Sequence, residues 1–119
     1  MLLKQRSRTY FYVTGFGKFA NILENPTTHL VRALPKLIRQ SQLPIHTKLD
    51  HSEIVTVSIQ DCDTALDQIY SRVASNMKKN HGAHHLVLNF GVAAGRSAFS
   101  LETLGKNIKD FRVPDERGN

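Results

Sequence analysis

The feature that most constrains the fold is a regular alternation of strand-like and helix-like segments. Residues 8–16 (RTYFYVTGF) are aromatic and β-branched, and a helical pattern follows in residues 25–41. A second β-branched segment spans residues 52–59 (SEIVTVSI), a second helical pattern spans residues 61–80, and residues 84–92 (HHLVLNFGV) are mostly apolar. Helical connections carry the chain across a sheet, so successive strands run parallel. The sequence therefore predicts the α/β class, with a mostly parallel sheet covered by helices.

The predicted strands differ in their polarity. The first runs from about Thr9 to Thr14 and is closed by Gly15. The second lies near Glu53 to Ile59 and alternates between apolar and polar residues. The third is continuously apolar over its centre, which is typical of a strand buried on both faces.

Capping residues and apolar spacing define two predicted helices. In the first, we expect Thr27 or Thr28 as the N-cap, and Pro35 is expected to kink or divide the helix. The second is expected to begin at the capping aspartates Asp61 and Asp63. The apolar residues at helical spacing are Leu30, Val31, Leu34, Leu37 and Ile38 in the first helix and Ala65, Leu66, Ile69, Val73 and Met77 in the second. Each helix therefore has one face suited to packing on a sheet.

Length and composition indicate one soluble domain. The chain has 119 residues, of which 40% are hydrophobic and 22% charged, and this suits a single domain over residues 1–119. No apolar run approaches the ~18 residues that a membrane span needs, and the N-terminus does not have the pattern of a signal peptide. The single cysteine, Cys62, cannot form an internal disulfide. We expect a cytoplasmic protein that does not interact with membranes.

Charge and histidine content suggest nucleic-acid or metal binding, but no motif supports either function. The net charge is +6, yet the sixteen basic residues are spread along the chain and no recognition motif accompanies them. Lys78 and Lys79 are explained by the dipole of a helix that ends near them. The spacing of His81, His84 and His85 matches no zinc pattern. We therefore expect no nucleic-acid partner, no metal and no cofactor.

The loop after the first predicted strand, GFGKFAN (residues 15–21), combines glycines with two phenylalanines. A phosphate-binding P-loop requires G-x-x-x-x-G-K-[ST], and this loop has neither the spacing nor the hydroxyl. A dinucleotide fingerprint requires G-x-G-x-x-G, but position 20 is alanine and no distal acid follows. Phe16 and Phe19 are therefore either core anchors or the walls of a slot for a small, flat, uncharged ligand.

Polar residues are concentrated after the third predicted strand. Gly95 is followed by the polar residues Arg96, Glu102, Asn107 and Arg112 and then by the turn sequence PDERGN in residues 114–119. Ligands bind beyond the carboxyl ends of the strands in parallel sheets, and the glycine-containing segments TGFGKF (residues 14–19) and FGVAAGR (residues 90–96) both lie at such ends, so we expect them to face one pocket. A solvated loop is the alternative interpretation.

Two blocks of the sequence resemble the N-terminal signature regions of pyroglutamyl peptidase type I, cysteine peptidases that remove N-terminal pyroglutamate. The first block is VTGFGKF with ENPT. The second is FGVAAGR, a glutamate six residues after the arginine, an asparagine, and FRVPDERGN. Both blocks occur in order and at about the family's separation, over about the first half of the family's length. The resemblance implies a truncated three-layer α/β/α sandwich, phosphorylase/hydrolase-like, of which this chain is the N-terminal part.

The resemblance also implies roles for individual residues. Glu102 falls on the family's catalytic glutamate, which orients and supports the histidine. Phe16 and Phe19 fall on the rings that flank the pyroglutamyl lactam. Val92 occupies the position whose backbone binds the lactam amide, and Arg112 matches an arginine at the edge of the active site. The implied activity is hydrolytic removal of N-terminal pyroglutamate from peptides by a Cys-His-Glu triad.

The chain departs from the family pattern in two respects. Where much of the family reads PFGG or similar, this chain reads KFAN, with Lys18 in place of proline. The family's nucleophilic cysteine and its histidine lie beyond residue 119. Cys62 precedes Glu102, and its flanking carboxylates would raise its pKa, so we interpret it as a bystander thiol.

Three functions remain compatible with these patterns. The chain is the N-terminal half of a pyroglutamyl peptidase, a catalytically inactive binding or regulatory module, or a small basic nucleic-acid-binding protein. A glutamate without a nucleophile and a base cannot perform acyl transfer, so the isolated chain is expected to be inactive. Because an incomplete domain exposes apolar faces, we also expect it to form oligomers or aggregates or to be only marginally folded.

Overall fold

The structure is a computed structural model that describes residues 7–41, 43, 46–110 and 112–119. Strands and helices alternate along the chain, as predicted. The elements are β1 (Thr9–Phe16), α1 (Pro26–Gln40), β2 (Thr47–Val55), α2 (Ile59–Lys79) and β3 (His84–Asn89).

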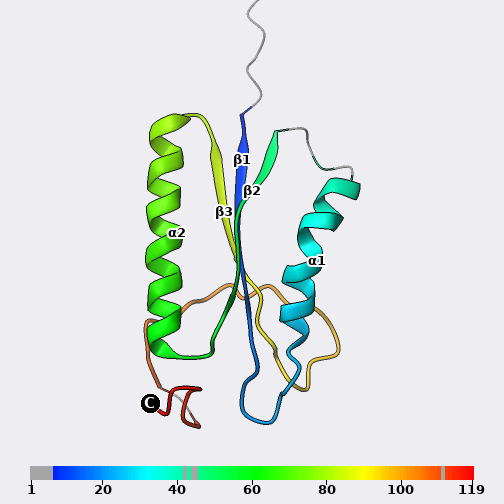
Figure 1. The fold of residues 1–119 in the computed structure, drawn as a ribbon, viewed down its shortest axis with the longest axis vertical. Helices are drawn as coiled ribbons and strands as arrows, with labels where there is room; N and C mark the ends of the chain where they lie inside the picture. The colour runs from blue at the N-terminus through cyan, green and yellow to red at the C-terminus, as the bar shows by residue number, and fades with distance from the viewer. Residues whose placement is uncertain (1–6, 42, 44–45, 111) are drawn as a thin grey trace, which may run out of the picture.

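The three strands form one parallel sheet in the order β2-β1-β3. The helices α1 and α2 lie on opposite faces of this sheet, so the molecule has three layers (Figure 1). All three strands end at the same edge of the sheet, where the loops that follow them meet at the lower end of Figure 1. The predicted α/β class is confirmed, and this edge is where a ligand site is expected.

The sheet face toward α2 carries the buried core. Tyr10, Tyr12 and Ile69 form a cluster of buried side chains, and Val73 packs against it from α2. Tyr12 and Ile69 are fully buried. The predicted apolar stripe of α2 is therefore correct at Ile69 and Val73, which lie one turn apart.

A polar network completes this face of the sheet. The Asn76 amide donates to the Tyr12 hydroxyl and to Asp50 Oδ2, both at 3.0 Å, and the Tyr12 hydroxyl lies 3.0 Å from His85 Nδ1. Burial raises the pKa of Tyr12. Burial also acts to raise the pKa of Asp50, but the Asn76 hydrogen bond and two nearby basic side chains outweigh it and lower that pKa. Asn76 is therefore buried although it is polar. Met77, which was predicted to lie on the apolar face of the helix, is exposed.

On the opposite face, α1 approaches β1 very closely at Gly15. A Cβ atom at Gly15 would lie 2.7 Å from the carbonyl oxygen of Thr27 and 2.7 Å from Cγ2 of Val31. Only glycine fits this position without a shift of the helix, because such distances are shorter than van der Waals contact.

The start of α1 differs from the prediction. The N-cap is Asn25, not Thr27 or Thr28, and its side chain accepts a hydrogen bond from Thr27 N at 2.9 Å. Proline at the first helical position suits this arrangement, because the first turn has no use for its amide hydrogen. Pro35 lies inside α1, and the helix continues to Gln40, so Pro35 does not divide the helix, and the kink stays a prediction.

The junction between β2 and α2 also corrects the prediction. The strand ends at Val55, and Ile59 is the first residue of α2. Ser58 is the N-cap, its hydroxyl accepting from Asp61 N at 3.0 Å, whereas Asp61 and Asp63 lie within the helix. The Ser58 hydroxyl also donates to the Asp61 carboxylate, so the aspartate is the partner of the cap rather than the cap, and the start of the helix was misplaced by three residues.

The strand β3 was predicted to be buried on both faces, and this prediction is wrong. It lies at the edge of the three-stranded sheet, and Leu86 and Val87 are exposed. The helices pack mainly over β1 and β2, and they cover β3 much less. Burial of β3 requires a further neighbour that the described residues do not provide.

Candidate functional site

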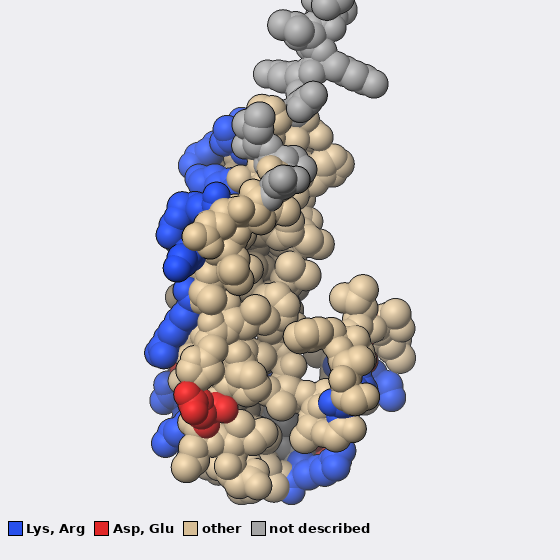
Figure 2. Space-filling model, turned by 90° about the vertical axis from the view of Figure 1, so that its right-hand side faces the viewer, with Lys and Arg blue, Asp and Glu red and all other residues tan. Residues whose placement is uncertain are grey.

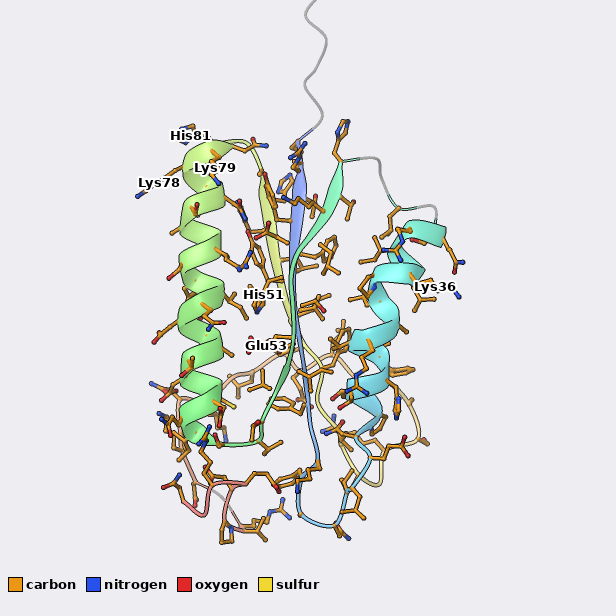
Figure 3. All side chains as sticks on the ribbon, viewed as in Figure 1. Lys36, His51, Glu53, Lys78, Lys79 and His81 are labelled. Atoms are coloured by element: carbon orange, nitrogen blue, oxygen red, sulfur yellow. The ribbon has the colours of Figure 1, made fainter. Side chains whose placement is uncertain are left out.

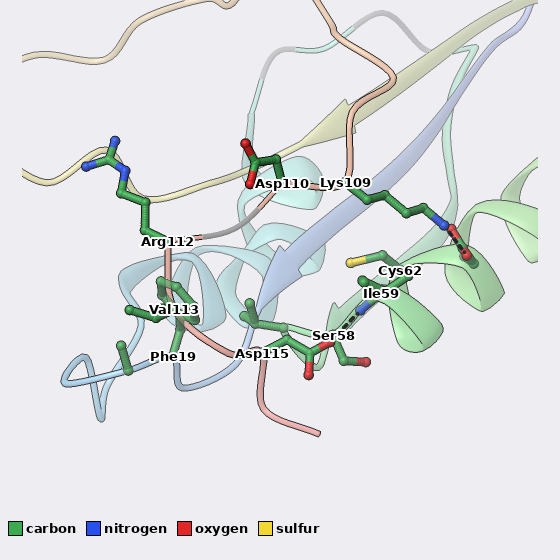
Figure 4. A pocket seen from close by; sticks show the side chains of 12 residues that line it. Phe19, Ser58, Ile59, Cys62, Lys109, Asp110, Arg112, Val113 and Asp115 are labelled. Atoms are coloured by element: carbon green, nitrogen blue, oxygen red, sulfur yellow. Dashed lines mark hydrogen bonds and ion pairs between the residues drawn. The ribbon is translucent and has the colours of Figure 1, made fainter. Parts of the chain in front are cut away.

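A pocket of about 630 Å³ lies at the carboxyl edge of the sheet. Three segments line it: the loop after β1, the junction between β2 and α2, and the segment before the C-terminus (Figure 4). Its lining residues are Phe19, Ala20, Val57, Ser58, Ile59, Cys62, Asp63, Lys109, Asp110, Arg112, Val113 and Asp115. The expectation that the two glycine-containing segments face one pocket is met only by the first of them: Phe19 lines the pocket, whereas no residue of FGVAAGR (residues 90–96) does.

The loop after β1, residues 17–25, is named the aromatic loop here, and the NPT sequence holds its two ends together. Thr27 Oγ1 accepts from Phe16 N at 2.8 Å, and Thr28 Oγ1 donates to Phe16 O at 2.6 Å. The Asn25 amide donates to Gly17 O at 3.0 Å. These polar side chains satisfy the backbone groups at the end of β1, so the loop leaves the sheet in a defined direction.

A tight turn places Phe19 in the pocket. Phe19 and Ile22 exchange two backbone hydrogen bonds of 3.0 and 2.8 Å. Ala20, inside this turn, has a φ of 49°, in the left-handed region that favours glycine. The turn therefore presents Phe19 toward the β2–α2 junction at some conformational cost.

The last residues, 115–119, form a turn that is docked on the start of α2, and we name it the C-terminal turn. Asp115 Oδ2 accepts from Ile59 N at 3.0 Å, and Asp115 Oδ1 accepts from the backbone of Arg117 and Asn119 at 2.9 Å each. These backbone hydrogen bonds, from Asn119 and Ile59 above all, lower the pKa of Asp115. The carboxylate thus organises the turn and satisfies a free amide of the helix.

A salt bridge strengthens the same junction. Arg117 Nε lies 2.5 Å from Asp61 Oδ2, and Nη2 lies 3.0 Å from Oδ1. The hydrogen bonds from Arg117, and that from Ser58, lower the pKa of Asp61 to about 2. The C-terminal turn, β2–α2 junction and pocket are therefore parts of one connected structure.

The residues predicted from the family resemblance do not all lie together. Phe19 and Arg112 both line the pocket. In Figure 4, Arg112 lies across the pocket from Cys62 and Asp115. Phe16 is half-buried at the end of β1 and is not among the lining residues. Val92 and Glu102 lie on the exposed segment after β3.

The carboxylate of Glu102 is engaged in an ion pair. Its Oε1 lies 2.7 Å from Arg96 Nη1, and both side chains are largely exposed to solvent. Arg96 belongs to the same polar segment that the sequence singled out. The described residues place no histidine or cysteine against this carboxylate, so the catalytic role of Glu102 remains a prediction.

Sequence reasoning missed the roles of Ser58, Asp115, Glu116 and Arg117. The sequence did indicate that Asp115, Glu116 and Arg117 belong to a turn, because PDERGN is typical of a turn rich in polar groups. Their function in docking the turn could not be inferred, because Asp61 and Arg117 are 56 residues apart.

Cys62 lines the pocket, and its side chain points toward the segment that carries Lys109 (Figure 4). Burial raises the pKa of its thiol, and the nearby carboxylates of Asp63, Asp61 and Asp115 act in the same direction. The predicted direction of the shift is confirmed, with burial as the larger cause. Since the thiolate is the nucleophilic form, this thiol is not activated.

Basic and histidine side chains lie mostly away from this pocket. Figure 2 shows Lys and Arg along one margin of the face that carries α1 and again at the lower end of this face. Lys78, Lys79 and His81 lie at the far end of α2, and His51 on β2 lies 3.0 Å from Glu53 (Figure 3).

Among the described residues, no group of three or more His, Cys, Asp or Glu side chains is arranged to hold a metal ion. In the same part of the chain, no helix is long and apolar enough to cross a membrane.

The fold and the pocket together define an α/β protein with a pocket at the carboxyl edge of a parallel sheet. Within this class, the family model described as pyroglutamyl peptidase matches residues 10–119. The chain belongs to the pyroglutamyl peptidase family.

Curated relatives agree with this assignment. The chain is similar to pyrrolidone-carboxylate peptidases from Fusobacterium nucleatum (29% identical), Staphylococcus carnosus (32%) and Staphylococcus saprophyticus (33%), each over 107 residues and 90% of this chain. The matched region covers 42%, 43% and 43% of these relatives, so the chain spans less than half of their length. No solved structure gives a significant match.

Proposed function

We propose that this chain contributes the lactam-binding part of a pyroglutamyl peptidase, an enzyme that hydrolyses the bond after an N-terminal pyroglutamate. The observation that supports the proposal best is that Phe19 and Arg112 line the same pocket, in a chain that belongs to this family. Pyroglutamate is a neutral, planar five-membered lactam. Aromatic walls and a few backbone hydrogen bonds suit such a ring better than charged groups do.

In the proposed site, Phe19 and Phe16 flank the lactam and the backbone of Val92 binds its amide. Arg112 lies at the edge of the site, near the peptide that follows the pyroglutamyl residue. Phe19 and Arg112 already share the pocket. Val92 and Glu102 would approach it when the exposed segment after β3 packs against further protein.

The proposed chemistry is acyl transfer by a Cys-His-Glu triad. A thiolate attacks the pyroglutamyl carbonyl, the peptide amine leaves with a proton from the histidine, and water then hydrolyses the thioester. Glu102 would orient the histidine and support its positive charge. Cys62 is not proposed as the nucleophile, because burial raises the pKa of its thiol. The nucleophile and the histidine therefore have to come from protein outside these 119 residues.

A binding or regulatory module is the second candidate function. The pocket is present in this chain, whereas Glu102 is paired with Arg96 and not with a catalytic base. Such a module would bind pyroglutamyl peptides in the cytoplasm without cleaving them. Joining the chain to the C-terminal part of a pyrrolidone-carboxylate peptidase separates the two candidates. Turnover supports the enzyme, and its absence supports the binding module.

The lactam site can be tested on the 119-residue chain itself. The isotope-labelled chain is titrated with L-pyroglutamamide while backbone amide signals are followed by NMR. We expect shifts at Phe19, Ala20 and Arg112 but not at Lys78, which lies at the far end of α2. L-Prolinamide, which has a charged amine in place of the lactam, is the control ligand. Equal shifts with both ligands, or shifts confined to other regions, would contradict the proposal.

A further inference from the structure

The Glu116 side chain connects the C-terminal turn to the aromatic loop. Its Oε1 accepts a hydrogen bond from Ala20 N at 3.2 Å, across 96 residues of sequence. The backbone of the same residue donates to Val57 O at 2.9 Å. Glu116 therefore contacts both the loop that carries Phe19 and the segment that leads into α2.

The contact falls on the least favourable backbone position of the aromatic loop. Ala20 has a φ of 49°, a left-handed conformation in which the Cβ lies too close to the following carbonyl oxygen. Such a conformation persists only where its surroundings hold it. The backbone pair between Phe19 and Ile22 holds the turn from within, and Glu116 holds it from outside.

The holding group is itself fixed in place. Asp115 binds the amide of Ile59, and Arg117 binds Asp61 through two N–H groups. Both partners belong to the first turn of α2. Because its two neighbours are anchored to a helix, Glu116 is a firm attachment point for a loop that otherwise lies at the surface.

We propose that Glu116 is a positioning residue for substrate binding: its carboxylate fixes the backbone at Ala20 and so holds Phe19 as a wall of the lactam slot. The proposal rests on the proposed function, because it assigns Phe19 to the lactam. Glu116 itself does not line the pocket, so its effect on binding is transmitted through the loop.

The first experiment measures the contact without any ligand. Backbone amide hydrogen exchange is recorded for the 119-residue chain and for Glu116→Ala, Glu116→Gln and Asp67→Ala. Glu116→Ala is expected to accelerate exchange at Ala20 several-fold, because its amide loses an acceptor. Glu116→Gln keeps an acceptor oxygen and is expected to restore slow exchange. Asp67 is an exposed acid on α2, so Asp67→Ala controls for the loss of one negative charge.

The second experiment measures the consequence for binding. The dissociation constant for L-pyroglutamamide is expected to rise about threefold to tenfold in Glu116→Ala and to stay near the parent value in Glu116→Gln and Asp67→Ala. The thermal unfolding midpoint, recorded for each variant, shows that the change is local. Rescue by glutamine distinguishes a positioning hydrogen bond from a general effect of charge or stability.

The outcomes separate this proposal from the proposed function. If Ala20 exchange is the same in Glu116→Ala and the parent, or if Glu116→Gln behaves like Glu116→Ala, the positioning role is wrong. If the parent chain does not bind L-pyroglutamamide, these 119 residues do not form a lactam site by themselves, and the proposed effect of Glu116 on binding is wrong. In that case the exchange experiment still decides whether Glu116 fixes the loop.

Discussion

Arg117 donates two hydrogen bonds to the carboxylate of Asp61, with Nε 2.5 Å from Oδ2 and Nη2 3.0 Å from Oδ1. Asp61 lies in the first turn of α2, where a carboxylate also interacts favourably with the helix dipole. Two parallel hydrogen bonds between a guanidinium and a carboxylate fix orientation as well as distance. The pair therefore anchors the C-terminal turn to the helix at the margin of the pocket.

Docking of the C-terminal turn is expected to weaken in acid. The hydrogen bonds from Arg117 and Ser58 lower the pKa of Asp61 to about 2, below the ordinary aspartate value of about 3.9. A carboxyl group whose pKa is lower in the folded state contributes stability above its unfolded pKa, and this contribution is lost as the pH falls toward the folded pKa. We expect the loss between about pH 4 and pH 2, measured as the thermal midpoint against pH. In Asp61→Asn this part of the pH dependence should disappear, and an ordinary titration of Asp61 by NMR would contradict the prediction.

Gly15→Ala is expected to destabilise the fold by about 1–3 kcal/mol. The new Cβ would lie 2.7 Å from both the Thr27 carbonyl oxygen and Val31 Cγ2, so α1 would have to move away from β1. The free energy of unfolding by urea measures the effect. Gly17→Ala is the matched control, because its Cβ would meet only Val55 O at 3.9 Å. Equal stability of the two variants would show that α1 does not approach β1 in this way.

Asn76→Ala is expected to cost about 1–3 kcal/mol of unfolding free energy. The substitution removes both donors that satisfy the Tyr12 hydroxyl and Asp50 Oδ2, and Tyr12 is fully buried. Ser75→Ala, at an exposed position of the same helix, is the control and should change stability by less than about 0.5 kcal/mol. A neutral result for Asn76→Ala would mean that water replaces the lost hydrogen bonds.

The order of elements could be predicted from sequence, but their caps could not. Apolar periodicity and β-branched residues mark β1 and the buried position of Ile69. The N-caps at Asn25 and Ser58 were misplaced, because nearby threonines and aspartates offer equivalent local patterns. Which polar side chain caps a helix depends on which one reaches the free backbone amides, and this is fixed only when the chain is folded.

Predictions that depended on distant contacts were the ones that failed or stayed open. The apolar sequence of β3 indicated an interior strand, but burial is a property of neighbours, and the described residues place none beyond β3. The family resemblance identified Phe19 and Arg112, which share a pocket. It could not reveal the hydrogen bond from Ala20 to Glu116, because these two residues are 96 positions apart in the sequence.

The 119-residue chain is expected to associate with itself. The edge strand β3 carries exposed Leu86, and Phe99 and Leu101 after it are more than nine-tenths exposed. Exposed apolar side chains and an unpaired strand edge both favour association. Analytical ultracentrifugation should show mass that increases with concentration. The double change Phe99→Ser and Leu101→Ser should reduce it, whereas Leu23→Ser, at an exposed position of the aromatic loop, should not. A monomer at every concentration would contradict the prediction.

The 119-residue chain alone is expected not to hydrolyse a pyroglutamyl-coumarin substrate. Its only thiol, Cys62, has a pKa raised by burial, and all six histidines precede Glu102, whereas the family's catalytic histidine follows the glutamate. When the chain is joined to the C-terminal part of a pyrrolidone-carboxylate peptidase, cleavage should appear. Glu102→Gln should then lower kcat about a hundredfold or more without altering the fold, because the histidine loses its orienting carboxylate. Turnover by the chain alone that survives Cys62→Ser would show that the chemistry is placed wrongly. A joined protein that is indifferent to Glu102→Gln would overturn the role of Glu102 while leaving the family assignment intact.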